Sequence, residues 1–100
     1  MIPTVFDTSD LVTKQRTSYD VLASLVSEVG ELAEEIAIQQ GHSGKTPGAD
    51  GVFGESVDVM ICALDMIHVN FPEITEEDVI SMVEQKCAKW LMMRDKWDNQ

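Results

Sequence analysis

The chain has 100 residues, the size of one domain, and we expect a single domain over residues 1–100. Its 44% hydrophobic content is globular and argues against disorder. The formal charge of −11 disfavours a nucleic-acid polymer as partner, because binding one needs clustered cations. No apolar run approaches the roughly 20 residues that span a bilayer, and the N-terminus lacks a secretory signal pattern. We therefore expect a cytoplasmic protein that does not bind membranes.

Helical periodicity dominates the chain, and clean apolar–polar alternation typical of strands is absent from the sequence. A short helix is expected over about 9–17, and long helices over 18–40, 54–70 and 75–97. The segment 40–54 contains five of the six glycines, which predicts a surface loop or a functional flap. The predicted fold class is all-α, a bundle of three long helices plus a short N-terminal helix.

The first two long helices differ in the placement of their apolar residues. The helix at 54–70 is apolar around its whole circumference, which is typical of a helix buried on all sides. The helix at 18–40 instead has one apolar stripe, formed by Leu22, Leu25, Val29, Leu32, Ala33 and Ile36. So short a chain has too few helices to surround one completely. We therefore expect a second copy of the chain to complete the bundle, in a homodimer or homotetramer.

Two acidic pairs stand beside these apolar surfaces. Glu28 and Glu31 border the stripe of the first helix, and Glu55 and Asp58 lie in the second. Residues three apart project from one helix face, so each helix offers a carboxylate pair to a shared seam. Converging like charges are costly in low dielectric unless protons or a cation neutralise them. Mg²⁺, which prefers oxygen ligands, is the expected cation; the alternative is an ordinary solvated acidic surface.

Two other metal sites fit the sequence less well. A zinc site is disfavoured because Cys62 and Cys87 form no Cys-x-x-Cys pair, and His42 and His68 show no ligand spacing to them. The cysteines are predicted to be buried free thiols. A di-iron bundle needs Glu-x-x-His motifs on two helices, and only the segment 65–68 comes close, with Asp in place of Glu.

The segment 25–34, followed by Glu-Ser-Val-Asp at 55–58, resembles the all-α nucleoside triphosphate pyrophosphohydrolases. These are the MazG-like enzymes, related to dimeric dUTPases and dCTP pyrophosphatases. Their signature is E-E-x-x-E followed by E-x-x-D on the next helix, and Ser27 replaces its first glutamate here. The match covers about residues 20–70. It implies Mg²⁺-dependent hydrolysis, with Mn²⁺ as a substitute, of a (d)NTP to (d)NMP and pyrophosphate in nucleotide-pool house-cleaning.

The resemblance also implies roles for individual residues. The catalytic and metal-binding positions are Glu28, Glu31, Glu55 and Asp58. Lys86 matches a lysine that the family carries in its last helix, although Trp90 and Met93 depart from the pattern further along. With Lys89 and Lys45 added from the distribution of basic residues, the substrate-binding candidates are Lys86, Lys89, Lys45 and Glu35. Glu35 is expected either to orient the metal ligands or to be an extra ligand. The alternative is a non-catalytic helical oligomer of the same fold, acting as a binding or regulatory module.

Overall fold

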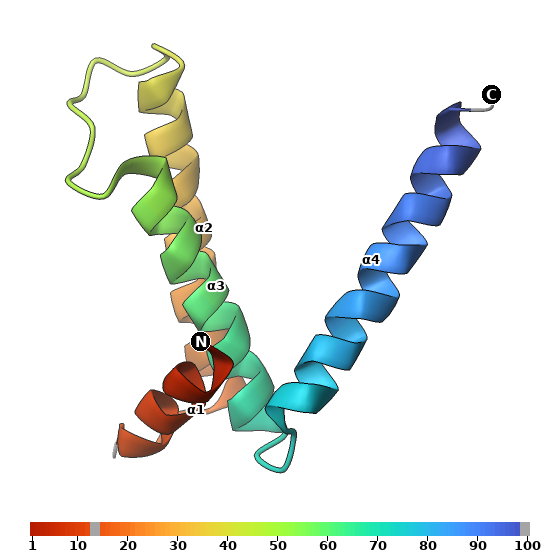
Figure 1. Ribbon diagram of the computed structural model, residues 1–100. Coiled ribbons are helices and arrows are strands. Elements are labelled where there is room, and N and C mark those ends of the chain that lie inside the picture. The colour runs from red at the N-terminus through yellow and green to blue at the C-terminus, as the bar shows by residue number, and fades with distance from the viewer. Residues whose placement is uncertain (13–14, 99–100) are drawn as a thin grey trace.

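The computed structural model describes residues 1–12 and 15–98, and the described part is helical without strands. The four helices are α1 (Ile2–Leu11), α2 (Ser18–Gln39), α3 (Gly51–Asn70) and α4 (Glu76–Asp98), as Figure 1 shows. The predicted all-α class is confirmed. In the described ranges, none of the helices combines the length and the apolar character needed to cross a membrane.

The three long helices lie within three residues of their predicted bounds, but the prediction for the short helix was wrong. It was expected over 9–17, whereas α1 begins at Ile2 and ends at Leu11. Pro3 lies in its first turn, where a missing N–H costs nothing because that group has no helical partner. Thr17 caps α2 through reciprocal bonds with Asp20, so the residues before it connect two helices.

The small core lies where α1 crosses the lower end of α3 (Figure 1). Ile2 and Phe6 of α1 pack with Leu64 of α3 and with Val79 near the start of α4. The antiparallel α2 packs along α3 as its main partner, and Val21 is its most buried residue, at 2% exposure. All the buried apolar side chains of the described residues therefore lie between residues 1 and 79.

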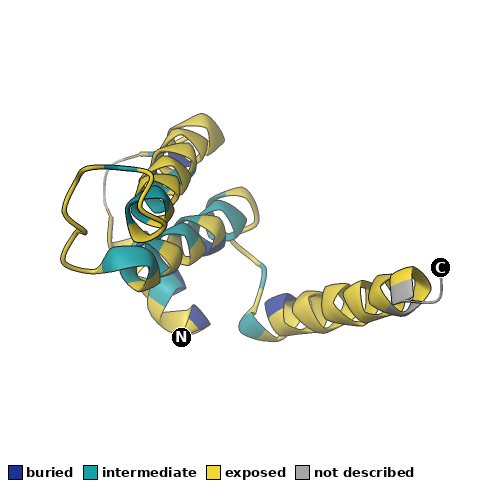
Figure 2. Ribbon diagram, turned by 90° about the horizontal axis from the view of Figure 1, so that it is seen from above, coloured by how far each residue is buried: buried dark blue, intermediate teal, exposed yellow. Residues whose placement is uncertain are grey.

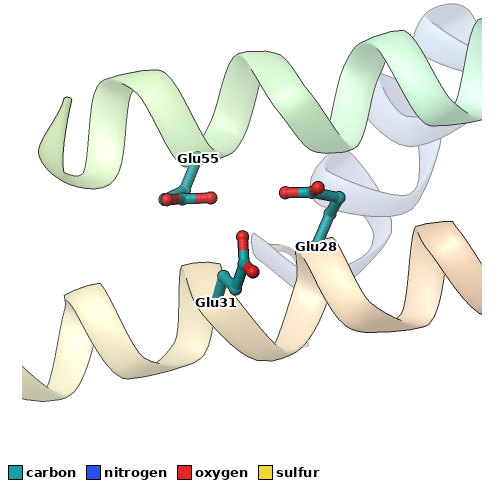
Figure 3. A group of neighbouring side chains, drawn as sticks. All are labelled: Glu28, Glu31 and Glu55. Carbon is teal, nitrogen blue, oxygen red and sulfur yellow. The ribbon is translucent and has the colours of Figure 1, made fainter. Parts of the chain in front are cut away.

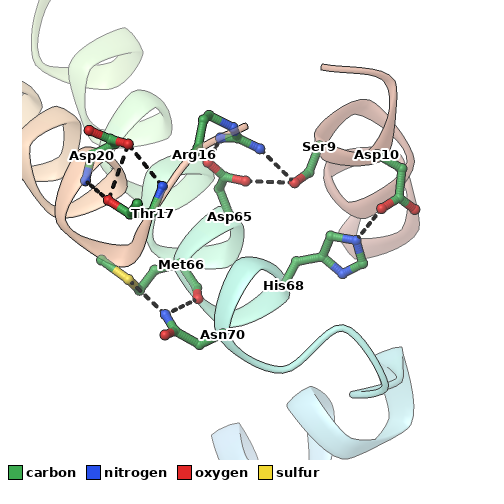
Figure 4. A network of polar contacts seen from close by, with 9 residues as sticks. All are labelled: Ser9, Asp10, Arg16, Thr17, Asp20, Asp65, Met66, His68 and Asn70. Atoms are coloured by element: carbon green, nitrogen blue, oxygen red, sulfur yellow. Dashed lines mark hydrogen bonds and ion pairs between the residues drawn. The ribbon is translucent and has the colours of Figure 1, made fainter. Parts of the chain in front are cut away.

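A polar network fastens the linker and α1 to α3 (Figure 4). The Arg16 guanidinium forms an ion pair with Asp65 and donates to Ser9 Oγ over 3.0 Å. Ser9 Oγ in turn donates to Asp65 Oδ1 over 2.7 Å. All three groups are partly buried, so Asp65 is held by partners that satisfy its charge.

His68 lies one turn further along α3 and closes the same end of the molecule. Its ring stacks on Phe6 with centroids 4.7 Å apart. Figure 4 shows its contact with Asp10, in which Nε2 lies 2.6 Å from Asp10 Oδ1. Asp65 and His68 were the nearest approach to a di-iron motif. In the structure both bind α1 or its linker, so they hold the fold together.

The fourth helix diverges from the other three, and Figure 2 shows it exposed along most of its length. Extensive helix packing among the described residues is confined to α2 with α3 and α1 with α3. The radius of gyration is 16.7 Å, above the roughly 13 Å of a compact domain of this length. Cys62 is half-buried but Cys87, on α4, is exposed, so the prediction of a buried thiol was wrong at Cys87.

Candidate metal centre

Three of the four predicted ligands converge where α2 and α3 lie side by side. Glu28 and Glu31 project from α2, and Glu55 projects toward them from α3 (Figure 3). One carboxylate oxygen from each lies within 4.8 Å of the other two. The arrangement follows from the antiparallel pairing of α2 and α3, because residues three apart share a helix face.

Two oxygens of this cluster lack any partner. Glu28 Oε2 and Glu55 Oε2 are both buried and accept no hydrogen bond. Buried polar atoms in folded proteins are nearly always bonded, so an orphaned pair on facing helices needs an explanation. Carboxylate oxygens that are shielded from water and unbonded are suited to a hard cation such as Mg²⁺.

The electrostatics of the cluster lead to the same conclusion. Desolvation raises the pKa of the Glu28 carboxyl, and the hydrogen bond and charge of Glu31 raise it further. Desolvation likewise raises the pKa of Glu55, followed by the charges of Glu31, Asp58 and Glu28. Each ionised carboxylate therefore opposes ionisation of its neighbours, and a divalent cation would reverse that opposition.

Asp58 lies close to the cluster but outside its tightest part. It is half-buried on α3, three residues after Glu55. Its charge contributes to the raised pKa values of Glu28 and Glu55, so it interacts with both helices of the site. Asp58 is thus placed to bind a cation directly or to orient the ligands that do.

The structure places Glu35 and Lys45 with the glycine-rich loop. Glu35 Oε1 accepts the backbone N–H of Gly48 over 2.8 Å, which ties the loop to α2. A Cβ on Gly48 would lie 2.7 Å from that oxygen, so a larger residue there would displace the end of the Glu35 side chain. Lys45 Nζ lies 2.5 Å from Glu34 Oε1 in an exposed ion pair. Both candidates therefore tether the loop, and neither belongs to the three-carboxylate cluster.

The structure does not bring the α4 candidates to the cluster within one chain. Lys86 and Lys89 are exposed on the diverging helix (Figure 1). Lys86 borders a largely apolar groove of about 660 Å³ at the base of α4, where Phe71 and Ile74 face Met82. A phosphate-binding role for these lysines thus needs an approach to the cluster that a single copy does not provide.

Sequence reasoning missed Cys62 as a neighbour of the acidic site. Burial raises the pKa of its thiol, and the charges of Glu28, Asp65 and Asp58 raise it further. The thiol therefore stays protonated at neutral pH and adds no charge near the acidic site. Its position four residues after Asp58 on the same helix is the signal that could have shown it.

Comparison with known proteins adds no relative, since no family model, curated protein or solved structure matches the chain. The chemistry of the site therefore rests on its own residues. A cluster of carboxylates with no cationic side chain among its converging atoms can hold a divalent cation through oxygen ligands and leave positions for water or phosphate.

Proposed function

We propose that the protein is a Mg²⁺-dependent nucleoside triphosphate pyrophosphohydrolase of the MazG-like type. The observation that carries the proposal is the convergence of Glu28, Glu31 and Glu55, with two buried, unpartnered oxygens. These are three of the four positions that the sequence resemblance assigns to the metal. The reaction splits a (d)NTP into (d)NMP and pyrophosphate as a house-cleaning step in the cytoplasm.

The chain's own residues suit the parts of this reaction. Glu28, Glu31, Glu55 and Asp58 would hold Mg²⁺, which when bound neutralises phosphate charge and lowers the pKa of water. Glu31 is exposed, whereas Glu28 and Glu55 are half-buried. The Glu31 carboxylate is therefore accessible to solvent and can accept a proton from the attacking water. Catalysis then depends on alignment and charge stabilisation at the α-phosphorus.

Self-association is part of the proposal. The extended shape and the exposed apolar side chains of α4 leave surface that a second copy would cover. The expected assembly is a homodimer or homotetramer. The expected substrate of the enzyme is a free nucleotide.

The reaction is tested with a panel of ribo- and deoxyribonucleoside triphosphates, with Mg²⁺ or Mn²⁺, assayed for pyrophosphate. In ¹⁸O-labelled water the label should enter the monophosphate, because attack is at the α-phosphorus. Label in pyrophosphate would mean attack at the β-phosphorus. Release of a nucleoside diphosphate and orthophosphate would reject the proposal.

A second candidate is a non-catalytic binding or regulatory module of the same fold. The distance of α4 from the acidic cluster favours it, because the predicted lysines do not reach the cluster within one chain. A protein that is stabilised by Mg²⁺ and hydrolyses none of the triphosphates would establish this candidate over the enzyme.

A further inference from the structure

The second helix presents two apolar faces, of which α3 covers only one. The covered face includes Val21, which is 2% exposed, and the half-buried Leu25 and Leu32. The uncovered face lies about 90° around the helix from the covered one, at 100° per residue. It consists of exposed side chains that recur every three or four residues over five turns, namely Tyr19, Leu22, Val26, Val29, Ala33 and Ile36. This repeat is typical of a seam that packs against another helix.

The fourth helix carries a matching unpaired seam. Its members follow the same spacing and are all exposed, namely Val83, Lys86, Trp90, Met93 and Trp97. Trp90 is 71% exposed although it is the largest apolar side chain at the middle of the helix. The helices have nearly equal lengths, 22 residues for α2 and 23 for α4. Each could cover the other along its whole length.

The charges of the two helices are complementary in only one orientation. α2 has five acidic residues and no basic one, and four of the five lie between 28 and 35. On α4 the basic residues gather at 86–96, whereas its first turn is acidic. A parallel pairing sets the basic half of α4 along the half of α2 that carries these acidic residues; their side chains point away from the seam, so the attraction acts between the two helices as wholes and not through ion pairs across the seam. An antiparallel pairing would oppose acid to acid, and two α2 helices would repel each other.

The fold supplies the same orientation. In Figure 1 both α2 and α4 rise from the end of the molecule where α1 lies, and they diverge upward. A twofold axis along that common direction leaves α4 of a second copy parallel to α2 of the first. Because the operation is reciprocal, both seams of both copies are covered in one closed dimer.

We propose that α4 of one copy packs parallel along the exposed face of α2 in a second copy, and the reverse. The interface deepens the self-association proposed above and does not depend on turnover. A register that sets Val26 against Val83 also sets Ala33 against Trp90. Gly30, where an added Cβ would meet nothing within 4 Å, leaves further room for the indole. The same register brings Lys86 to the helix that carries Glu28.

Site-directed cross-linking tests the pairing. In a Cys62→Ser background, Cys87 of α4 stays as the native probe and Ala33→Cys adds a second thiol on the exposed face of α2. The matched control is Ser27→Cys, which is exposed on the same helix but outside both faces. A short bismaleimide is applied to the full chain, linked peptides are identified by mass, and circular dichroism verifies folding. We expect 33–87 links between copies and at least about tenfold fewer 27–87 links.

Three cross-linking results would overturn the interface. Equal linking from positions 27 and 33 would remove its specificity. A dominant 33–33 link would place α2 against α2, and a dominant 87–87 link in the background protein would place α4 against α4. A chain of 11.1 kDa by light scattering, with no links, would overturn self-association as well, while the pyrophosphate assay would be judged separately.

A second pair of variants tests the same face without cross-linking. Val26→Asp puts a charge in the seam, and Ser27→Asp puts the same charge one residue away. Because an unpaired charge is costly to bury, Val26→Asp should raise the dimer dissociation constant at least about tenfold, and Ser27→Asp should leave it nearly unchanged. Equal effects of the two variants, with helix content retained, would contradict the proposal.

Discussion

The second and fourth helices have similar lengths and similar apolar repeats, yet the chain buries them to very different extents. One face of α2 is covered by α3, and Val21 is almost inaccessible. Among the α4 residues whose burial is described, only Val79, at the base of the helix, is buried, and both tryptophans are exposed. The difference shows that an apolar repeat predicts that a helix face will be covered, but not whether the cover comes from the same molecule.

The largest expected effect is on turnover, and it belongs to the α2–α3 half. Asp58→Asn should lower kcat by about 100-fold or more, because it removes negative charge from the carboxylate group that holds the cation. Glu34→Gln is the control, since Glu34 lies on α2 but pairs with Lys45 in solvent. Steady-state release of pyrophosphate measures both. Full activity of Asp58→Asn would remove this residue from the site.

The next largest difference is expected in stability, when apolar side chains are truncated in the core and on α4. Leu64→Ala should lower the free energy of unfolding by about 2–5 kcal/mol, because Leu64 is buried in the core with Phe6 and Val79. Leu91→Ala, at an exposed site on α4, should cost about 0.5 kcal/mol or less in dilute solution. Urea denaturation over a range of protein concentrations measures both. A large loss for Leu91→Ala in the dissociated monomer would show that α4 packs within its own chain.

Mg²⁺ should specifically stabilise the region formed by α2 and α3, where the carboxylate cluster lies. A ligand at 100 times its dissociation constant adds about 2.7 kcal/mol when it binds only the folded state. For a domain of this size, each kcal/mol raises Tm by about 4–8 °C. Thermal scans with and without Mg²⁺ should show this shift, and Glu28→Gln should reduce it strongly. An equal shift in the variant would place the cation elsewhere.

The smallest expected effect is the pH dependence of the metal-free protein. The folded-state pKa values of Glu28 and Glu55 are raised, so their contribution to stability is fully present below the unfolded value and is lost as pH rises. Without metal, Tm should therefore increase from pH 7 toward the ordinary value of 4.5. Glu28→Gln should flatten the profile, and so should saturating Mg²⁺. A Tm that falls over this range in parallel for both proteins would contradict the mechanism.

Sequence reasoning recovered what depends on local periodicity. It located α2, α3 and α4 within a few residues, and it brought Glu28, Glu31 and Glu55 together, because residue spacing fixes which side chains share a face. Sequence reasoning could not predict that the apolar stripe of α2 divides into a covered and an uncovered face, because the spacing of residues along one helix does not show which other helices pack against it.

Sequence reasoning also could not predict the long-range polar contacts. The ion pair of Arg16 with Asp65 joins residues 49 apart, and the bond from Glu35 to Gly48 fixes a loop whose path has no periodic signal. The short helix was misplaced for a related reason. The region around Ser9 lacks strong helix signals, and α1 is held by contacts with Leu64 and His68 that only the fold creates.

Both helices with uncovered faces begin with the same reciprocal bonds. Thr17 exchanges hydrogen bonds with Asp20, and Thr75 does so with Asp78, whose pKa is lowered by the bonds from Thr75. Nucleation is the costly step in forming a helix, so each cap starts its helix at the base, where the molecule is already packed. α4 should then fray from its far end, and amide exchange should quicken from Val79 toward Trp97. Association with a second copy should reduce this gradient in exchange rates, because contacts along α4 would form first at its capped base and then toward its far end.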